Sequence, residues 1–194
     1  MDIKFIEDAI ESHIDCFKKL KEDKSILDAF IKAVNVSIKA IENGNKIFFA
    51  GNGGSSSDAQ HASAELVVRF NKNRKAISAI ALGTNTAIST AISNDFGYEY
   101  IFSRQLESLA KKNDIVIGIS TSGNSKSILN LLLKAKELGC ITIGLTGQLG
   151  GKMNDLSDHL IKVPSKTVST IQEIHGFLLH LYCQIIEDSL FLDK

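Results

Sequence analysis

The sequence predicts a doubly wound α/β fold, in which a three-layer sandwich with a central parallel sheet of about five strands is preceded by helices. Short runs that are apolar throughout alternate with segments whose apolar residues recur every three or four positions, a pattern typical of buried parallel strands separated by amphipathic helices. Two loops rich in glycine and hydroxyl residues each follow an apolar run and open a helix. At 194 residues the chain has the length of one such domain.

Two amphipathic helices are predicted ahead of the first strand. Apolar side chains recur at helical spacing over residues 3–20 and again over residues 27–41. Residues 1–45 are therefore predicted to form a helical lead-in to an α/β core of residues 46–194, the two together making a single domain. The apolar faces of these helices could pack on the same chain or enter a subunit interface, and the pattern does not choose between them.

The core elements follow in alternation. Strands are predicted at 46–50, 76–81, 114–119, 140–146 and 159–163. Helices are predicted at 57–70, between 84 and 111, at 125–138 and at 168–190. Gly139 stands where a helix ends, and Pro164, the only proline, closes the last strand. In open parallel sheets ligands bind beyond the carboxyl ends of the strands, where both polar loops emerge.

Composition argues against several classes of function. Lys plus Arg and Asp plus Glu number 22 each, so no net charge favours nucleic acid or an anionic membrane as a partner. No apolar run approaches the roughly 20 residues of a membrane span, and the N-terminal residues lack the pattern of a signal peptide. We therefore expect a cytoplasmic protein. Cys16, Cys140 and Cys183 are widely spaced and are expected to be buried thiols.

The two polar loops are the strongest indication of a ligand. They cover residues 50–57 (Ala-Gly-Asn-Gly-Gly-Ser-Ser-Ser) and 120–125 (Ser-Thr-Ser-Gly-Asn-Ser). Glycines let the backbone approach a ligand closely, and hydroxyls with free N–H groups at a helix start favour an anion. One such loop alone is more often a helix cap and turn. Two of them in one small domain indicate a phosphosugar site.

Polar side chains near these loops could supply chemistry. His61 and Glu65 are four residues apart on one helical face, so they could coordinate one metal ion or form a solvated His–Glu pair. In the last helix Gln172, His175 and His180 interrupt an apolar pattern. The two histidines are rivals for a functional role, and for each the alternative is a buried imidazole bonded to a backbone carbonyl.

Several blocks of sequence together carry a family resemblance. They are Gly-Asn-Gly-Gly-Ser at 51–55, His61 with Glu65, Ser-Asn-Asp-Phe-Gly at 93–97, Ile-Ser-Thr-Ser-Gly-Asn-Ser at 119–125, Gly-Gly-Lys-Met at 150–153 and Ile-Gln-Glu-Ile-His at 171–175. In this order, and over essentially the full length, the chain resembles bacterial phosphoheptose isomerases, which are single-domain sugar-isomerase (SIS) proteins. It departs from them at Ser169-Thr170, where relatives often carry Asp-Arg or Pro-Arg.

The resemblance implies an SIS fold, a homotetramer with active sites at subunit interfaces, and one bound zinc ion per subunit. It also implies conversion of sedoheptulose 7-phosphate into D-glycero-D-manno-heptose 7-phosphate, for lipopolysaccharide or other surface glycans. By matching positions, the metal ligands would be His61, Glu65, Gln172 and His180. The substrate would be held by Asn52, Gly53, Gly54, Ser55, Glu65, Asn94, Asp95, Ser120, Thr121, Ser122, Ser125 and Gln172.

This reaction moves a proton from C1 to C2 of the sugar, so it needs a base, an acid and a group that stabilises enediolate charge. In our hypothesis Glu65 moves the proton from C1 to C2, and His180 transfers the proton between the two oxygens. Zinc polarises the carbonyl. The alternative function is a non-catalytic SIS tetramer that binds the bacterial replication initiator. A scaffold has no physical need for the complete metal set. A sugar-phosphate sensor would need a DNA-binding domain, which residues 1–45 are too short and too neutral to supply.

Overall fold

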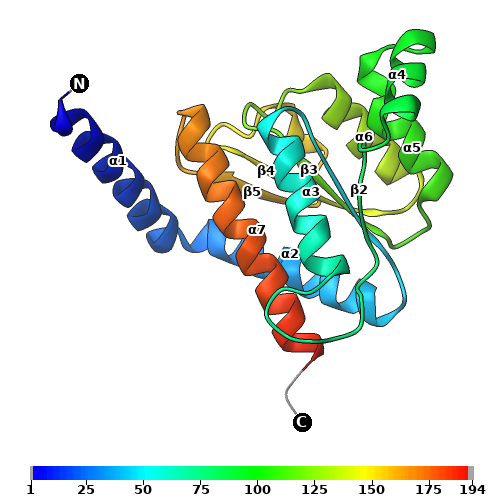
Figure 1. The fold of residues 1–194 in the computed structure, drawn as a ribbon, viewed down its shortest axis with the longest axis horizontal. Coiled ribbons are helices and arrows are strands. Elements are labelled where there is room, and N and C mark those ends of the chain that lie inside the picture. The colour runs from blue at the N-terminus through cyan, green and yellow to red at the C-terminus, as the bar shows by residue number, and fades with distance from the viewer. Residues whose placement is uncertain (1, 192–194) are drawn as a thin grey trace.

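A computed structural model describes residues 2–191 as a three-layer α/β sandwich (Figure 1). Its five strands are all parallel and lie in the order β2–β1–β3–β4–β5. They are β1 (Ile47–Gly51), β2 (Ala79–Ala81), β3 (Ile115–Ile119), β4 (Ile141–Gly147) and β5 (His159–Val163). The predicted fold class is confirmed.

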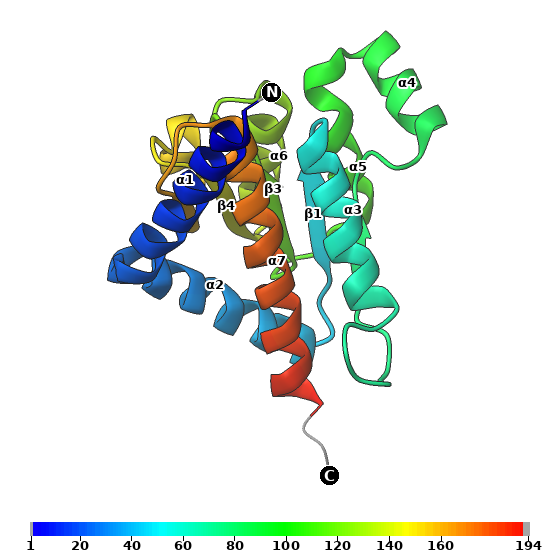
Figure 2. The ribbon, with the colours of Figure 1, turned by 60° about the vertical axis from the view of Figure 1, so that its left-hand side comes forward.

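Helices cover both faces of the sheet (Figures 1 and 2). One face packs against α2, α3 and α7, and the other against α4, α5 and α6. The helices are α1 (Ile3–Glu22), α2 (Lys24–Glu42), α3 (Gly54–Val67), α4 (Thr86–Asp95), α5 (Ile101–Leu109), α6 (Lys126–Glu137) and α7 (Val168–Leu190), with 3₁₀ turns η1 (Tyr98–Tyr100) and η2 (Gly151–Asp155).

The central strands are apolar throughout because each contributes to two cores. In β1, Phe49 belongs to the core under α2, α3 and α7, whereas Phe48 belongs to the core under α5 and α6. In β3 the same alternation places Ile117 on the first side and Val116 on the second. All four side chains are at most 1% exposed. Successive strand residues point to opposite faces, so a strand covered on both sides has no polar position.

Most element boundaries agree with the sequence prediction to within one residue, but the helix predicted at 57–70 lies at Gly54–Val67. Two other boundaries have a local explanation. The second helix begins at Lys24 because the Asp23 carboxylate caps it, accepting from the N–H groups of Ser25 and Ile26. The second strand is shorter than predicted. At its predicted start, Ile77 donates its N–H to the carbonyl of Leu66 at the end of α3.

The helices predicted between 84 and 111 are α4 and α5, with the 3₁₀ turn η1 between them. The break falls at Gly97, whose φ of +103° is a conformation that residues with side chains rarely adopt. The residues between α4 and η1 therefore form a compact turn. Asn94 and Asp95, which the resemblance assigned to the substrate, lie just before it in the last turn of α4.

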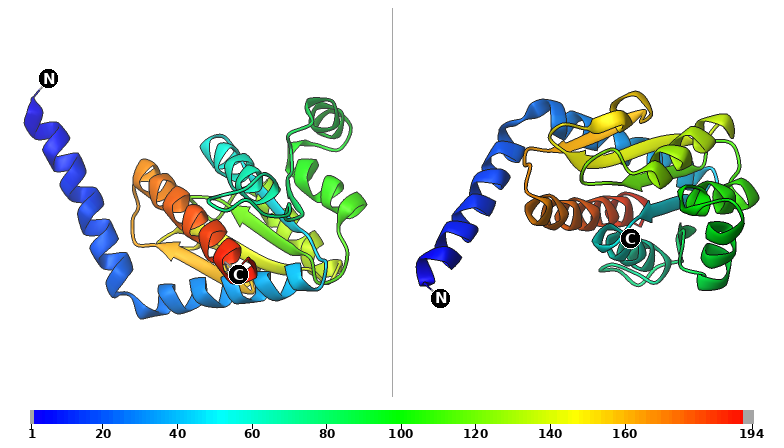
Figure 3. Two further views of the ribbon diagram at one scale, coloured as in Figure 1. Left: turned by 60° about the horizontal axis from the view of Figure 1, so that its bottom comes forward. Right: turned by 90° about the horizontal axis from the view of Figure 1, so that it is seen from above.

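Helix α1 extends away from the sandwich (Figures 1 and 3). It meets α7 through an edge-to-face contact of Phe17 with Phe177 and an ion pair of His13 with Glu173. Its large apolar side chains are nevertheless between 39% and 72% exposed: Ile3, Phe5, Ile6, Ile10, Ile14 and Phe17. Burying one such side chain contributes about 1.5–3 kcal/mol. We call these six side chains the apolar stripe of α1. Packing on the same chain, one of the two predicted alternatives, leaves most of the apolar stripe exposed to solvent.

The remaining structural expectations concern the thiols and the membrane. Cys16, Cys140 and Cys183 are all free and buried, as predicted. Across residues 2–191, no helix has both the length and the apolar character that spanning a bilayer requires.

Candidate active site

Three side chains from two helices meet at the seam between α3 and α7. His61 and Glu65 lie on one face of α3, with His61 Nε2 3.0 Å from Glu65 Oε1. His180 comes from α7, and its Nε2 lies 3.4 Å from His61 Nε2. All three potential ligand atoms lie within 4.8 Å of one another. Helical spacing indicated the pairing within α3, and the family resemblance had added His180, which the fold brings to the same place.

This cluster has the donor chemistry and the spacing of a site for a divalent metal. A tetrahedral zinc ion with metal–nitrogen distances of about 2.0–2.1 Å would separate two nitrogen ligands by about 3.3–3.4 Å. The two imidazole nitrogens have this separation, and they face each other from rings 4.7 Å apart at 84°. Two nitrogens and a carboxylate oxygen suit zinc and other transition metals. The residues present therefore fit the ion that the family resemblance implies.

Asp58 adds a negative group beside the two histidines. It lines a small cavity together with His61 and His180, one turn before His61 on α3. Its Oδ2 atom is buried and has no hydrogen-bond partner among the described residues. Burial raises the pKa of this carboxyl, while His61 and His180 act in the opposite direction. A cation held by the histidines would offset the cost of this buried oxygen.

The two polar loops lie at the carboxyl ends of β1 and β3, and each leads into a helix whose N-terminus no side chain caps. Side chains of Asp2, Asp23 and Asn85 cap α1, α2 and α4, whereas α5 and α7 also lack such a cap but do not follow a glycine- and hydroxyl-rich loop. The free N–H groups of a helix start attract anions when no side chain satisfies them. The uncapped starts of α3 and α6 thus support the prediction of a phosphate site.

Asn52 links the two loops through its side chain. Its Nδ2 donates to the hydroxyls of Ser125, at 2.8 Å, and Ser127, at 3.0 Å. Its Oδ1 accepts from the phenol of Tyr98, at 2.7 Å. The sequence assigned Asn52 to substrate binding, but the side chain is already bonded to protein groups at three points. The structure therefore favours a role for this amide in holding the loops together.

Among the other predicted substrate residues, the structure gathers Ser55 and Ser120–Ser125 at the same sheet edge. Ser120 and Ser122 hydroxyl oxygens are 3.5 Å apart. Asn94 and Asp95 lie at the end of α4, where their side chains bond each other at 2.8 Å. No described side-chain hydrogen bond joins this pair to the loops, so their assignment to the substrate stays a prediction.

Gln172 lies over the first loop. A Cβ atom placed on Gly54 would collide with its side-chain amide, so the glycine is needed for this approach. Gln172 is thus near the start of α3, while His180 faces His61 two turns further along that helix. Gln172 as a fourth metal ligand stays a prediction.

His175 and His180 have different environments, which separates the two rivals. His175 is fully buried, and its Nε2 lies 3.2 Å from the carbonyl oxygen of Thr146 in β4. Burial lowers the pKa of His175 to about 4, a shift that this backbone contact only partly opposes. His175 is therefore a neutral core histidine, the alternative that the sequence left open, whereas His180 is exposed at the metal cluster.

Comparison with known proteins decides the family. Residues 10–147 match the sequence model of the SIS domain. The chain is 46% identical to a phosphoheptose isomerase of Aneurinibacillus thermoaerophilus, over 97% of this chain and 98% of that protein. It is 52% identical to one of Aliarcobacter butzleri, over 82% and 84% of the respective chains. The chain belongs to the phosphoheptose isomerase family of SIS-domain proteins.

A solved structure supports the same family at the level of the fold. A phosphoheptose isomerase from Francisella tularensis superposes with a TM-score of 0.92 at 32% identity, covering 97% of this chain and 99% of that one. The likeness extends over the N-terminal helices as well as the α/β core. The predicted recognition and the predicted SIS fold are confirmed, and the chain is an isomerase of this family.

Sequence analysis missed several residues of this phosphoheptose isomerase site. Ser127 and Tyr98 contact Asn52, and Asp58 lies beside the histidines. Lys166 lines a cavity of about 320 Å³ together with Thr121 and Ser122. Only the Asp58 position carried a usable signal, since it lies one helical turn before His61.

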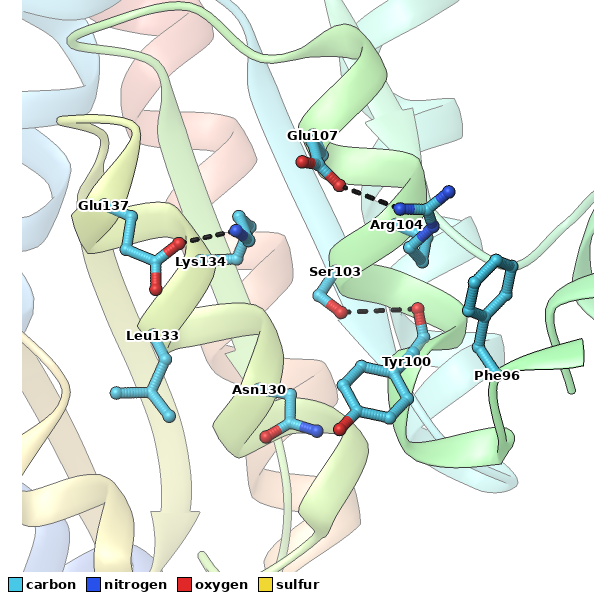
Figure 4. A pocket seen from close by; sticks show the side chains of 9 residues that line it. All are labelled: Phe96, Tyr100, Ser103, Arg104, Glu107, Asn130, Leu133, Lys134 and Glu137. Atoms are coloured by element: carbon cyan, nitrogen blue, oxygen red, sulfur yellow. Dashed lines mark hydrogen bonds and ion pairs between the residues drawn. The ribbon is translucent and has the colours of Figure 1, made fainter.

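A larger cavity, of about 570 Å³, lies away from the phosphoheptose isomerase site, between α5 and α6 (Figure 4). Its charged lining residues neutralise one another: Arg104 pairs with Glu107 at 3.5 Å, and Lys134 with Glu137 at 2.5 Å. Arg104 also stacks over the ring of Phe96. Since both cations are paired, this groove is a poorer phosphate site than the uncapped helix starts.

Proposed function

We propose that this protein isomerises sedoheptulose 7-phosphate to D-glycero-D-manno-heptose 7-phosphate through an enediolate, with a zinc ion held at the α3–α7 seam. The observation that carries the proposal is the meeting of His61, Glu65 and His180 between α3 and α7, because α3 itself begins at the first polar loop with an uncapped N-terminus. Relatives at 46–52% identity bear the name phosphoheptose isomerase. Together these support a metal centre beside a phosphate site.

The phosphate of the substrate is held by the two loops. Hydroxyl groups of Ser55, Ser120, Ser122 and Ser125 and the N–H groups at the starts of α3 and α6 supply neutral donors. Neutral donors bind a phosphate less tightly than a guanidinium fork does, so the substrate is released readily. Lys166, at the edge of the neighbouring cavity, adds a positive charge near Thr121 and Ser122.

At the other end of the substrate, Glu65 removes the proton from C1 and returns it to C2. His180 transfers the proton between the two oxygens. Zinc, when bound by His61, Glu65, Gln172 and His180, would supply Lewis-acid polarisation of the substrate carbonyl. The contact between Glu65 and His61 keeps the carboxylate oriented toward the cluster before substrate arrives.

We further propose that the protein is a homotetramer and acts in the cytoplasm. The apolar stripe of α1, exposed in the single chain, supports burial against other subunits. Three free, buried cysteines are consistent with a reducing compartment. The scaffold alternative is disfavoured, because the metal cluster is geometrically formed and the relatives named above are isomerases.

The direct test is incubation of purified protein with sedoheptulose 7-phosphate, followed by NMR. The proposal predicts appearance of the aldose phosphate. Fructose 6-phosphate serves as a ketose phosphate one carbon shorter, for which we expect slower conversion. If the protein leaves sedoheptulose 7-phosphate unchanged in every metal state and instead binds a replication initiator, the scaffold alternative replaces the proposal.

A further inference from the structure

A buried ion pair joins the two helices that carry the metal cluster. Arg74 lies in the loop after α3, and Glu187 lies in the last turn of α7. Arg74 Nε donates to Glu187 Oε2 at 2.6 Å, and each side chain is only 1% exposed. We propose that Arg74 and Glu187 are positioning residues for the metal cluster, because they fix α3 against α7. This inference rests on the proposed function and deepens its metal site.

Glu187 holds the loop that follows α3. Its carboxylate accepts from the N–H groups of Phe70, Asn71 and Lys72 at 2.9, 2.6 and 2.8 Å, in addition to Arg74. Figure 1 shows this loop lying against the C-terminal end of α7. Burial opposes ionisation of the carboxyl, but these donors outweigh it and lower the pKa of Glu187 to about 2. The carboxylate is therefore charged, and the loop is tied to α7 throughout the physiological pH range.

Arg74 connects this loop to the backbone of a metal-cluster residue. Its guanidinium donates to the carbonyl oxygens of Glu65 and Leu66, both at 2.8 Å. These carbonyls belong to the last turn of α3, where a helix has no partners of its own for its carbonyl groups. A cation at a helix C-terminus is also favoured by the helix dipole. Arg74 therefore caps α3 at the residue whose side chain faces His61.

On the other side, the same loop reaches His180. Phe70, whose N–H is bound by Glu187, packs its ring against the imidazole of His180, with centroids 5.9 Å apart and planes at 36°. His180 and Glu187 are seven residues apart on α7 and so lie on one face. The Arg74–Glu187 ion pair and the loop bound to it thus contact the backbone of Glu65 through Arg74 and the ring of His180 through Phe70. A slide of either helix would change the 3.4 Å separation of the histidine nitrogens.

The choice of charged residues supports a role in geometry over one in stability alone. Apolar side chains of similar volume often stabilise a buried position as well as an ion pair does, because they avoid the desolvation of two charges. The ion pair adds directional hydrogen bonds, because a planar guanidinium can bond a carboxylate and two carbonyls at once in a fixed arrangement. Placement of the ligand atoms within a fraction of an ångström needs such direction.

The test measures metal binding independently of turnover. We would determine the zinc dissociation constant by competition with a chromophoric chelator, and record the visible absorption spectrum of the cobalt-substituted protein. Glu187→Gln and the double variant Arg74→Met/Glu187→Leu are expected to weaken zinc binding at least tenfold and to alter the cobalt spectrum. Arg74→Lys keeps the positive charge but lacks the planar guanidinium that bonds several acceptors at once. It should fold and show a smaller loss of zinc affinity.

Two controls separate positioning from general loss of stability. Glu137→Gln makes the same substitution in the ion pair with Lys134 on the opposite face of the sheet, and it should leave zinc affinity unchanged. Leu106→Ala removes a fully buried side chain from that same face, so it should lower stability while changing zinc affinity less than twofold.

Wild-type zinc affinity and an unaltered cobalt spectrum in the double variant would overturn the inference, while conversion of substrate by the wild-type protein would leave the proposed function standing. A wild-type protein that binds zinc but does not convert the substrate would contradict the proposed function alone. A wild-type protein that binds no divalent ion would overturn both.

Discussion

The phenol of Tyr98 donates a 2.7 Å hydrogen bond to the side-chain oxygen of Asn52, and this bond joins the turn after α4 to the first polar loop. The Asn52 amide in turn donates to Ser125 and Ser127 in the second loop region. One amide therefore sets the position of three segments that are distant in sequence. The turn that follows Asn94 and Asp95 at the end of α4 is fixed to the polar loops through Tyr98.

Tyr98→Phe is expected to raise KM for the sugar phosphate about two- to tenfold, with little change in kcat. The substitution removes one hydrogen bond of about 0.5–1.5 kcal/mol that orients the loops. Steady-state kinetics would measure both constants. Tyr100→Phe, two residues further along, leaves the Asn52 contact intact and should behave as wild type. A fall in kcat at constant KM would show that Tyr98 acts in the chemical step instead.

The two histidines of α7 should differ sharply on truncation. His180→Ala removes a nitrogen from the metal cluster, so we expect loss of bound zinc and at least a hundredfold lower turnover. His175→Ala leaves a cavity under β4, so it should lower stability but keep zinc binding within a few fold. Metal content by elemental analysis and turnover by NMR distinguish these outcomes. The opposite ranking would exchange the roles of the two residues.

Stability should depend on pH through His175. Its pKa of about 4 in the folded protein lies below the usual 6.5, so the unfolded chain binds a proton first as pH falls. The wild-type protein should therefore lose stability between pH 6.5 and pH 4, by up to about 3 kcal/mol more than His175→Gln, in which no imidazole titrates. Urea unfolding of the metal-free proteins at several pH values measures the difference. Parallel pH profiles would contradict the buried neutral state.

The apolar stripe of α1 predicts the effect of a charge on assembly. Ile10→Glu places a carboxylate in the middle of the stripe and should shift the proposed tetramer to smaller species, as measured by light scattering coupled to size-exclusion chromatography. Ser12→Glu introduces the same charge on the opposite side of α1 and should leave the assembly intact. Unchanged assembly in Ile10→Glu would mean that α1 lies outside the subunit contacts.

The sequence predicted most of the sheet because each central strand is covered on both faces and therefore reads as an uninterrupted apolar run. Ile115–Ile119 differs by one residue from the prediction, and His159–Val163 agrees with it. The second strand was overestimated because Ile77 is apolar yet bonds to the end of α3 outside the ladder. More than one helix was predicted between 84 and 111, and α4 and α5 confirm this, with the break at Gly97.

The site was predictable where its residues are close in sequence. His61 and Glu65 share a helical face by spacing alone. Their approach to His180, 119 residues from His61, depends on how α3 lies against α7, which no local pattern encodes. Only one feature of the Arg74–Glu187 pair is visible in the sequence, namely a glutamate on the buried face of the last helix. Its partner, Arg74, can be identified only from the fold.

The most direct test of the metal-assisted isomerase is the conversion of sedoheptulose 7-phosphate by purified protein before chelation, after chelation and after zinc add-back. The account predicts loss of turnover on chelation, recovery with zinc, and no recovery in Glu65→Gln even though this variant still binds the ion. Full turnover by the metal-free protein, or near wild-type turnover by zinc-loaded Glu65→Gln, would contradict the roles assigned to the metal cluster.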